Sequence, residues 1–568
     1  MLEADFYKRV AYALCVLLVT AMGCGTDAVP PGGDDDDPPP PPPPVTDPGV
    51  FSTRPSRSST IAITEDNSHI VMVNPDDGSL SVFATADNAR TAKIPTGAGP
   101  ASVVVAADNK TAYVANRGDA TVVKVSGIDG GTPQVSATTD VGAEPIGLAL
   151  SPSGKRLFVA EFAASRVSVI NTATMQIERS ISVDRPRAIL VTNNGNTNDN
   201  DDQVVVAQYY GVPVAGREAR DDGRTGLVST FSVDQLTKGV DITLAPIDSG
   251  LGVKTSPNQL AAMAVAAGRV YITSVSASPE GPAKFDGNVF PVVYVADLTA
   301  GTEVRDDSGT TNLTVKLRDA IPAPSPTSPR FLPGDLSDIA FLGTTNVAYA
   351  IGKAGDVMVR IVYGSTVAVG STQNKEIDLG GNATIGTCQG PIGLVVSQEL
   401  GRAYVNCWVS RKLALVDLSI QTMTQTFEAS PGPANAVEAS VQRGKRFFFT
   451  GRGRWSNAGT NGAKGGEGWS SCGSCHPDGL TDNITWIFPA GPRQTISMDG
   501  TFSHAPGRAQ EQRVLNWSAI FKEVHDFERN TRLVSGGLGA ITDPGPSGCN
   551  KPDEVARPLA LDGYKDGK

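Results

Sequence analysis

Two cysteines and a histidine lie together in the segment GEGWSSCGSCHPDGL, residues 466–480. Cys472, Cys475 and His476 have the spacing C-x-x-C-H, for which three kinds of chemistry compete. A disulfide needs only the two thiols and gives the histidine no role. A zinc site needs two further ligands. The residues able to supply them beside the two thiolates, at no familiar spacing, are His476, His504, His525 and Cys549. A c-type haem uses all three residues of the motif, because the thiols add to the porphyrin vinyl groups and the adjacent histidine binds the iron.

The N-terminus predicts the compartment in which this motif matures. Lys8 and Arg9 precede the apolar run VAYALCVLLVTAMGC, which is too short to span a bilayer and is typical of an export signal. Its last residues, AMGC, resemble a bacterial lipoprotein processing site, in which Cys24 becomes the lipidated first residue. We therefore expect a signal peptide over residues 1–23 and a disordered Asp/Pro-rich tether over residues 24–50, which includes seven consecutive prolines.

In an exported chain, C-x-x-C-H favours one covalent haem c over zinc or a simple disulfide. The sixth iron ligand then decides the chemistry, because a methionine closes the iron to substrates and an exchangeable ligand opens it. Met498 is the first candidate for that ligand and His504 is the alternative. An open iron is the third option.

The segment from GKRFFFTGRGRW through CGSCHPDGL to GPRQTISMDG resembles the haem domains of bacterial di-haem cytochrome c peroxidases and their relatives. This resemblance implies that Cys472 and Cys475 are the attachment thiols, that His476 is the proximal ligand and that Arg493 contacts a haem propionate. Those enzymes need two haem motifs, whereas this chain has one. We therefore expect a small, mostly α cytochrome c-like domain over residues 441–568, incomplete as a peroxidase and with its catalytic residues unknown.

A repeat upstream predicts the elements that position this motif. The stretch EPIGLALSPSGKRLFVAEFAASRVSVINTATMQIERSI, from Glu144, aligns with GPIGLVVSQELGRAYVNCWVSRKLALVDLSIQTMTQTF, from Gly390. Each copy has four short strands separated by turns, which is the pattern of one propeller blade. The prolines that open the copies are Pro55, Pro100, Pro145, Pro186, Pro257, Pro333 and Pro391. We therefore predict a mainly β fold, with a seven-bladed β-propeller over residues 51–440.

The second-strand sequences AYVANRGD, LFVAEFAA and AYVNCWVS resemble the Tyr-Val-Thr-Asn family of bacterial propeller repeats. This resemblance implies the fold and leaves the function open. Long insertions follow the second strands of the fourth and fifth copies, at residues 212–226 and 277–290. Because successive strands of a blade run in opposite directions, all loops that follow second strands open on the same face of the disc. Both insertions therefore lie on one face, where we expect the haem segment. After the seventh copy, ANAVEASVQ and KRFFFTG are expected to form one more strand pair.

Two further cysteines lie in the last copy, Cys388 before its first strand and Cys407 at the end of its second. Antiparallel neighbours bring these ends together, so an oxidising compartment favours a disulfide between them.

The net charge of −11 argues against nucleic acid or anionic lipid surfaces as partners. The sequence favours an exported c-type cytochrome that transfers electrons to a periplasmic or cell-surface redox protein and touches the membrane only through a lipid at Cys24. Two other classes stay open. One is a peroxidase-like haem oxidoreductase, and the other is a surface-binding propeller with a peripheral haem.

Overall fold

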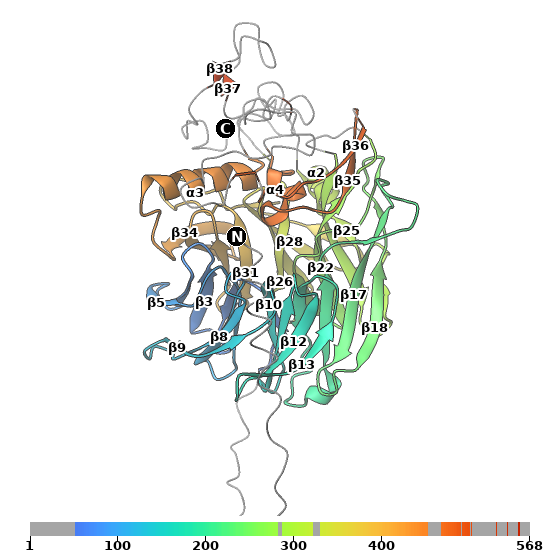
Figure 1. The fold of residues 1–568 in the computed structure, drawn as a ribbon. Helices are drawn as coiled ribbons and strands as arrows, with labels where there is room; N and C mark the ends of the chain where they lie inside the picture. The colour runs from blue at the N-terminus through green and yellow to red at the C-terminus, as the bar shows by residue number, and fades with distance from the viewer. Residues whose placement is uncertain are drawn as a thin grey trace, which may run out of the picture. The chain divides into compact units, whose positions relative to one another are not determined.

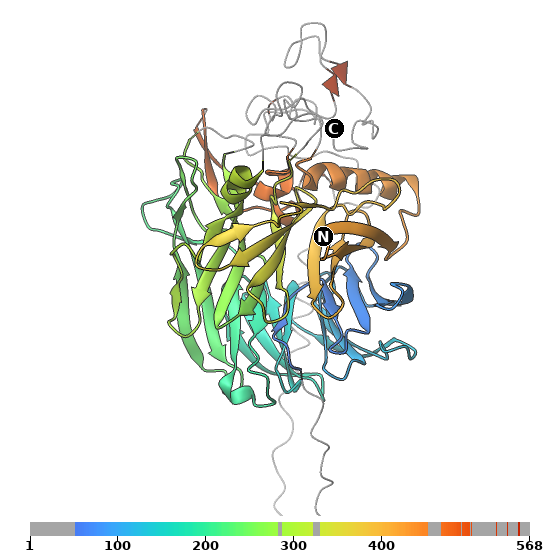
Figure 2. The same ribbon diagram turned by 180° about the vertical axis from the view of Figure 1, so that it is seen from behind.

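A computed structural model describes residues 52–281, 287–321, 330–452, 467–489, 491–499 and 501–502, together with 530, 542–543 and 555–556. Cys24, His504, His525 and Cys549 lie outside the described residues. Within the described part, seven antiparallel sheets of four to six strands follow one another along the chain. Figures 1 and 2 show them arranged side by side as the blades of a propeller. The predicted propeller is confirmed.

The first three blades are simple four-stranded meanders. Blade 1 contains β2 (Ile61–Ile63), β3 (His69–Asn74), β4 (Ser79–Ala84) and β5 (Arg90–Pro95). Blade 2 contains β6 (Pro100–Val105), β7 (Thr111–Asn116), β8 (Thr121–Ser126) and β9 (Gln134–Asp140). Blade 3 contains β10 (Pro145–Leu150), β11 (Arg156–Glu161), β12 (Arg166–Asn171) and β13 (Gln176–Ser182).

Blades 4, 5 and 6 have added strands, whereas blade 7 is again a simple four-stranded meander. Blade 4 contains β14 (Pro186–Val191), β15 (Gln203–Gln208), β17 (Arg224–Ser232) and β18 (Lys238–Leu244), with β16 (Val212–Pro213) on β17. Blade 5 contains β21 (Met263–Ala266), β22 (Arg269–Ala277), β23 (Val289–Asp297) and β24 (Thr302–Glu303), with β25 (Thr311–Asn312) on β23. Blade 6 contains β26 (Leu336–Phe341), β27 (Val347–Gly352), β28 (Val357–Tyr363) and β29 (Val367–Val369), with β30 (Ile377–Asp378) on β28. Blade 7 contains β31 (Pro391–Ser397), β32 (Arg402–Cys407), β33 (Lys412–Asp417) and β34 (Thr422–Glu428).

The burial of the strands follows their place in each blade. In blade 3 the first strand, β10, is buried along its whole length, whereas the fourth strand, β13, is almost wholly exposed. The first strands lie innermost, where neighbouring blades contact both of their faces, and this favours uninterrupted apolar runs such as PIGLAL. Gly154, at φ +69°, supplies the left-handed residue that the turn between β10 and β11 requires.

The ring closes by packing between the last and the first blade. Apart from β1, which joins the sheet of blade 4, each blade is built from one continuous segment. Tyr404 and Leu413 of blade 7 pack against Ile70 and Phe83 of blade 1. The segment ANAVEASVQRGKRFFF, predicted as a strand pair, is instead the helix α3 (Ala436–Phe449). The side chain of Asn435 accepts hydrogen bonds from the backbone N–H groups of Val437 and Glu438. This cap explains the helix.

The N-terminal segment of the described chain runs through the centre of the ring. The strand β1 (Ser56–Arg57) pairs with β14 of blade 4 and not with blade 1. The guanidinium of Arg57 lies 2.5 Å from Asp338 of blade 6, and the Ser59 hydroxyl donates to the same carboxylate at 2.7 Å. Asp338 also accepts a bond from the backbone N–H of Leu394 in blade 7. The segment therefore ties three blades together.

The remaining short elements lie outside the seven blades. They are η1 (Asp199–Asp201), β19 (Ile247–Asp248), β20 (Lys254–Thr255), α2 (Leu313–Ala320), α4 (Cys472–Cys475), η2 (Pro477–Gly479), β35 (Thr485–Phe488), β36 (Gly491–Gln494), β37 (Thr542–Asp543) and β38 (Val555–Ala556). Both ribbon views show α3, α4 and the β35–β36 hairpin along one face of the propeller. The domain boundary expected at residue 440 falls inside α3. No helix in the described residues is long and apolar enough to cross a membrane.

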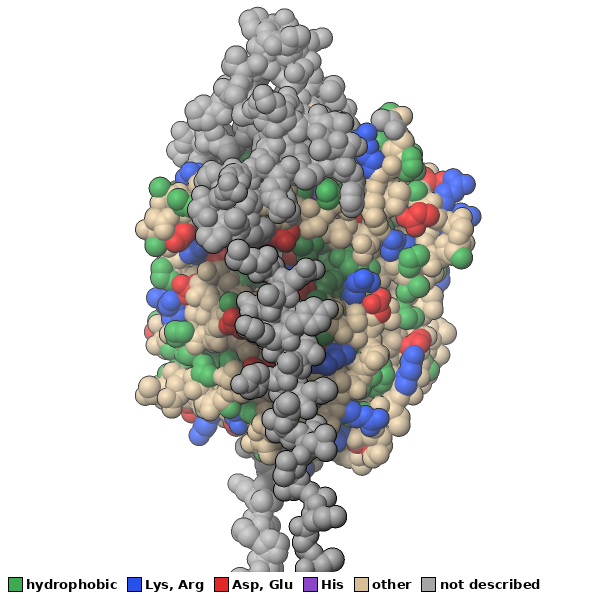
Figure 3. Space-filling model, viewed as in Figure 1, with side chains coloured by type: hydrophobic (Ala, Val, Ile, Leu, Met, Phe, Trp, Pro, Cys, Tyr) green, Lys and Arg blue, Asp and Glu red, His purple; other side chains and the backbone are tan. Residues whose placement is uncertain are grey.

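The surface seen in Figure 3 carries Lys and Arg side chains interspersed with Asp and Glu side chains. Neither sign gathers into a broad patch on that face.

Candidate functional site

The predicted attachment residues lie on the one-turn helix α4, which a buried carboxylate of blade 6 fixes at its start. The backbone N–H of Ser471 donates to the Ser474 hydroxyl at 2.8 Å, one half of a capping box. Asp335 accepts hydrogen bonds from the hydroxyls of both Ser471, at 2.6 Å, and Ser474. Burial raises the pKa of Asp335, and the positive charge of Lys353 and the two hydroxyls oppose that rise. The propeller therefore positions the turn that bears the two thiols.

The thiols and the imidazole of the motif follow one another on this turn. Cys472 is exposed, Cys475 is half-buried, and the two are not bonded to each other. The Nδ1 atom of His476 lies 3.2 Å from the carbonyl oxygen of Leu480. Burial lowers the pKa of His476, although the carbonyls of Leu480 and Ile496 oppose that shift. A neutral imidazole with Nδ1 held by a carbonyl has Nε2 as its metal-binding atom, so this donor set fits a covalently attached haem.

The further ligands that zinc would need, His504, His525 and Cys549, lie outside the described residues, so the zinc alternative stays a prediction. No group of three or more His, Cys, Asp or Glu side chains in the described ranges is arranged to hold a metal ion. Burial, together with Asp482 and Asp335, raises the pKa of the Cys475 thiol well above its usual range.

The turn after the motif is held by two arginines from different blades. Asp478 lies 2.7 Å from Arg187 of blade 4 and 3.0 Å from Arg117 of blade 2. Burial opposes ionisation of Asp478, but the two guanidinium groups hold its pKa well below the usual range. Arg187 also lies 4.6 Å from the ring centroid of Tyr209. This ion-pair cluster fastens the CHPDG sequence to the propeller.

The main chain around the motif is bound to blades 4 and 5. Gln259 Nε2 donates to the Ser474 carbonyl at 2.6 Å and Asn258 Nδ2 to the Asp482 carbonyl at 3.0 Å. The Tyr210 hydroxyl donates to the Thr481 carbonyl at 2.8 Å. These contacts come from loops that follow second strands or that join successive blades. Both kinds of loop open on one face of the disc, which is the face predicted for the haem segment.

Both insertions contact the haem-motif segment, as the sequence predicts. Arg224, in the insertion of blade 4, donates to the Asn483 carbonyl. In the insertion of blade 5, the Pro279 carbonyl accepts from the Ile487 N–H at 3.2 Å, and the Val289 carbonyl accepts from the Trp469 indole at 2.9 Å. The two insertions therefore form part of the surface on which the described C-terminal residues lie.

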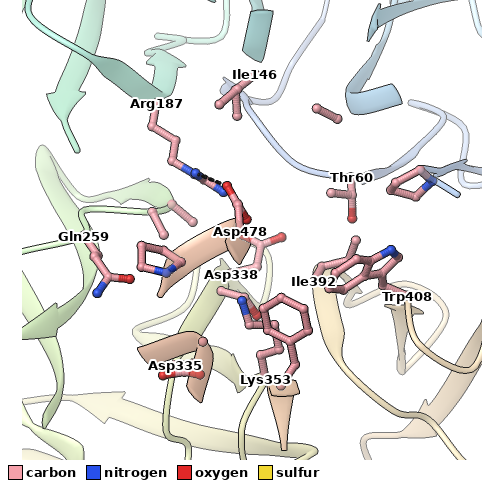
Figure 4. Close-up of a pocket in the computed structure, with 18 of the residues that line it drawn as sticks. Thr60, Ile146, Arg187, Gln259, Asp335, Asp338, Lys353, Ile392, Trp408 and Asp478 are labelled. Carbon is pink, nitrogen blue, oxygen red and sulfur yellow. Dashed lines mark hydrogen bonds and ion pairs between the residues drawn. The ribbon is translucent and has the colours of Figure 1, made fainter. Parts of the chain in front are cut away.

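A cavity of about 630 Å³ lies between this segment and the upper end of the central channel. Gly473, Pro477 and Asp478 line it on the side of the motif. Figure 4 shows Arg187, Lys353 and Trp408 entering it from different blades. Cys472, Cys475 and His476 are not among its lining residues. The thiols and the cavity therefore lie on different sides of α4.

The structure separates the other predicted site residues. Met498 lines the cavity, and its N–H donates to the Gly479 carbonyl at 2.8 Å, so it lies near the turn after His476. Arg493 lies in β36 with its guanidinium 5.8 Å from the centroid of the Phe488 ring. No contact between Arg493 and the C-x-x-C-H residues is present among the described residues. His504, the alternative ligand, lies outside them.

Cys388 and Cys407 form a disulfide with an S–S distance of 2.01 Å, the pairing expected from the sequence.

Several residues that shape the site are not apparent from the sequence. They are Arg117, Arg187, Gln259, Asp335 and Lys353. Arg187 directly follows the proline that opens the fourth copy, and Asp335 follows the proline that opens the sixth. The position of Arg187 and Asp335 in their repeats therefore predicts the face of the propeller on which they lie. It does not predict the residues that they contact.

A family model supports the propeller fold. Residues 51–191 match the family model described as Lactonase, 7-bladed beta-propeller. The solved structure titled Kuenenia stuttgartiensis Hydrazine Synthase is similar with a TM-score of 0.48 and 14% identity, over 66% of this chain and 99% of that chain. A protein of Desulfotomaculum acetoxidans, titled as functionally unknown, is similar with a TM-score of 0.40 and 10% identity, over 63% of this chain and 93% of that one. No curated protein gives a significant match to the sequence. The chain thus forms a seven-bladed β-propeller, followed by the C-x-x-C-H segment, and its first part resembles the lactonase propeller family.

Proposed function

We propose that this protein is an exported c-type cytochrome that transfers electrons through one haem bound covalently at Cys472 and Cys475, with the propeller as docking platform. One observation carries the proposal. A single turn presents both thiols and is followed by a neutral imidazole, that of His476, whose Nδ1 is held by the Leu480 carbonyl. This leaves Nε2 as the atom directed to iron by the chemistry of the motif.

The chain's own residues have distinct roles in this proposal. The thiols of Cys472 and Cys475 would form the two thioether bonds, and His476 would bind the iron. Asp335 holds the start of α4. Arg187 and Arg117 form ion pairs with Asp478 and so hold the turn that follows the motif. When bound, the haem supplies an iron centre that accepts and releases one electron. Met498, with His504 as the alternative, is the proposed sixth ligand, and Arg493 the proposed propionate partner.

The anchor is part of the same proposal. Lipid at Cys24 would hold the protein on a membrane outside the cytoplasm, where a soluble or surface redox protein could reach it. The described chain begins at Ser52, whose hydroxyl lies 3.3 Å from Glu65 in the turn between the first two strands of blade 1. Labelling with a radioactive fatty acid tests the anchor, and Cys24→Ala should abolish it.

Haem attachment is tested by expressing the full chain in a host whose periplasm matures c-type cytochromes. The wild type should keep a haem stain through denaturing electrophoresis, and Cys472→Ala with Cys475→Ala should lose it. The double variant Cys388→Ala with Cys407→Ala is a matched control, because it removes two cysteines away from the motif and should keep the stain. An unchanged stain in the first double variant would refute the proposal.

Electron transfer itself is tested on the stained protein. It should be reduced by a small-molecule donor and reoxidised by a cytochrome acceptor, with no sustained turnover of hydrogen peroxide. Sustained turnover of peroxide with a reduced donor would instead identify a peroxidase-like oxidoreductase. A folded exported protein that never acquires haem would favour a surface-binding propeller.

A further inference from the structure

Several blades begin with a residue whose backbone is left-handed. Such residues directly precede the inner strands β6, β10, β14, β26 and β31, and another lies shortly before β21. With φ between +39° and +61°, they are Gly99, Glu144, Arg185, Gln259, Asp335 and Gly390. Glycine adopts this conformation freely, whereas a residue with a Cβ atom does so at a cost. A buried side chain kept at such a position, where glycine would be unstrained, points to a function for that side chain.

Two of these residues bury their side chains against the haem motif. Gln259 of blade 5 is 4% exposed and Asp335 of blade 6 is 5% exposed. Both contact Ser474, the buried residue directly before Cys475. Asp335 accepts a hydrogen bond from the Ser474 hydroxyl, and Gln259 Nε2 donates to the Ser474 carbonyl at 2.6 Å. Neighbouring blades therefore hold Ser474 by its side chain and by its main chain at once.

The amide of Gln259 has a single orientation that satisfies its contacts. Its Nε2 atom faces a carbonyl, which can only accept, and its Oε1 atom accepts from the Tyr209 hydroxyl at 3.2 Å. Tyr209 is itself buried. The hydroxyl of Tyr209 therefore directs the donor of Gln259 toward Ser474.

The same tyrosine connects this contact to the ion pair that follows the motif. The guanidinium of Arg187 lies 4.6 Å from the centroid of the Tyr209 ring and 2.7 Å from the carboxylate of Asp478. Ser474 comes shortly before His476 in the chain, and Asp478 comes shortly after it. His476 therefore lies between two residues that one connected group of propeller side chains holds.

We propose that Gln259 and Asp335 are positioning residues for the C-x-x-C-H turn, which act together on Ser474 and fix the orientation of His476. The turn cannot rotate about Ser474 without breaking both hydrogen bonds. The role toward haem rests on the proposed function. The hold on Ser474 does not, because it needs only side chains of the described chain.

The hold is tested first without haem, in the full exported chain carrying Cys472→Ala and Cys475→Ala. Hydrogen exchange is measured by mass spectrometry on peptides spanning residues 470–480. They include the His476 N–H, which donates to the carbonyl of residue 472 at 2.9 Å. Gln259→Met keeps the size of the side chain and removes its donor, so exchange of this turn should become about tenfold faster. Exchange in the inner strands β10 and β31 should stay unchanged, which shows that the propeller remains folded.

Gln421→Met is the matched control. Gln421 also has a left-handed backbone, with φ of +53°, and is 5% exposed. Its Nε2 donates to the Tyr349 hydroxyl at 2.8 Å and to the Leu418 carbonyl at 2.5 Å, but it lies in the outer turn of blade 7. The same substitution there should leave exchange of residues 470–480 unchanged. An equal increase from both substitutions, or none from Gln259→Met, would overturn the proposal.

A double-mutant cycle tests the contribution of Asp335. Ser474→Ala removes a hydroxyl that donates to Asp335, and should make exchange of the turn about threefold faster. Adding Ser474→Ala to Asp335→Asn should have little further effect, because both substitutions break the same hydrogen bond. Ser474→Ala and Gln259→Met break different bonds, so their effects should multiply. Independent effects of Ser474→Ala and Asp335→Asn would overturn the role of Asp335.

Haem-loaded protein then tests the orientation of His476. Electron paramagnetic resonance of the ferric haem reports how the axial imidazole is oriented, so Gln259→Met should shift the low-spin signals and Gln421→Met should not. Unchanged signals in Gln259→Met would overturn the positioning of His476. A wild type without haem would refute the proposed function instead, and the exchange rates would still decide whether Gln259 and Asp335 hold the turn.

Discussion

The guanidinium of Arg187, at the start of blade 4, lies 2.7 Å from the carboxylate of Asp478, directly after the C-x-x-C-H-P sequence. Arg117 of blade 2 approaches the same carboxylate at 3.0 Å. The side chains of Arg117, Asp478 and Arg187 are 24%, 27% and 19% exposed, so leaving one of them without its counter-charge would be moderately costly. The pairing therefore links the position of the haem motif to the assembly of the propeller.

Asp478→Asn should destabilise the chain by about 2 kcal/mol, because it leaves two arginines without their shared anion. Urea unfolding at pH 7 measures the change. Asp184→Asn is the control, since Asp184 pairs with Arg185 at 3.5 Å with both side chains well exposed. It should cost less than about 0.5 kcal/mol. Equal effects of the two substitutions would show that the Asp478 cluster does not anchor the motif.

The same carboxylate predicts a loss of stability in acid. Its folded pKa is held well below its usual range, whereas an aspartate in an unfolded chain titrates near about 3.9. The contribution of Asp478 is therefore complete above about pH 4 and is lost as the pH falls toward the folded pKa. Stability measured from pH 5 to pH 2 should fall less steeply in Asp478→Asn than in the wild type. Parallel curves would contradict this assignment.

The repeat predicts the blades because each blade is a local structure. Turn residues and four short strands recur along one continuous segment, so Pro100, Pro145 and Pro391 begin inner strands at their expected positions. The disulfide is predictable for the same reason, since Cys388 and Cys407 belong to neighbouring antiparallel strands. The ion pairs of Asp478 are not predictable this way. They join residues from blades 2 and 4 to a segment hundreds of residues later, and no pattern in one sequence specifies that meeting.

The error at α3 has a different cause. The run RFFF has strong strand propensity, and it led to the predicted strand pair. Asn435 followed by Glu438 is an N-terminal helix signal, and Glu438 also accepts from the Ala434 N–H at 2.9 Å. The helix is half-buried against the propeller, with Phe449 buried at its end. Packing of that face and the cap outweighed the local propensity.

Removing the disulfide should cost about 3 kcal/mol, since it closes a loop with a sequence separation of 19. Both sulfurs are buried, so the double alanine variant is the appropriate change. Thermal unfolding of the variant and of the wild type, each with and without reductant, measures the effect. Reductant should lower the melting temperature of the wild type only. A variant as stable as the wild type would show that the bond is dispensable.

The sixth ligand should be identified by its spectrum. If Met498 binds iron, the ferric protein should show the weak far-red band of methionine-ligated haem, and Met498→Ala should remove it and allow cyanide to bind. His504→Ala is the matched comparison. A spectrum altered by His504→Ala and not by Met498→Ala would assign the ligand to His504 and predict a low potential. The main-chain bond from Met498 to Gly479 should persist in the alanine variant, because it uses only backbone atoms.

Asp482 should give the folded chain a second, opposite dependence on pH. Its carboxylate is buried, with the Trp486 indole at 3.1 Å and the Ile484 N–H at 2.9 Å. Burial raises its pKa to about 7, although these hydrogen bonds oppose the rise. Between about pH 4 and pH 7 the folded chain binds a proton that the unfolded chain has released, so stability falls as the pH rises, by up to about 1.4 kcal/mol per unit. Asp482→Asn keeps an oxygen acceptor and cannot ionise. Urea unfolding at pH 5 and pH 8 should show a smaller decrease in the variant than in the wild type, and an identical decrease would place the titration elsewhere.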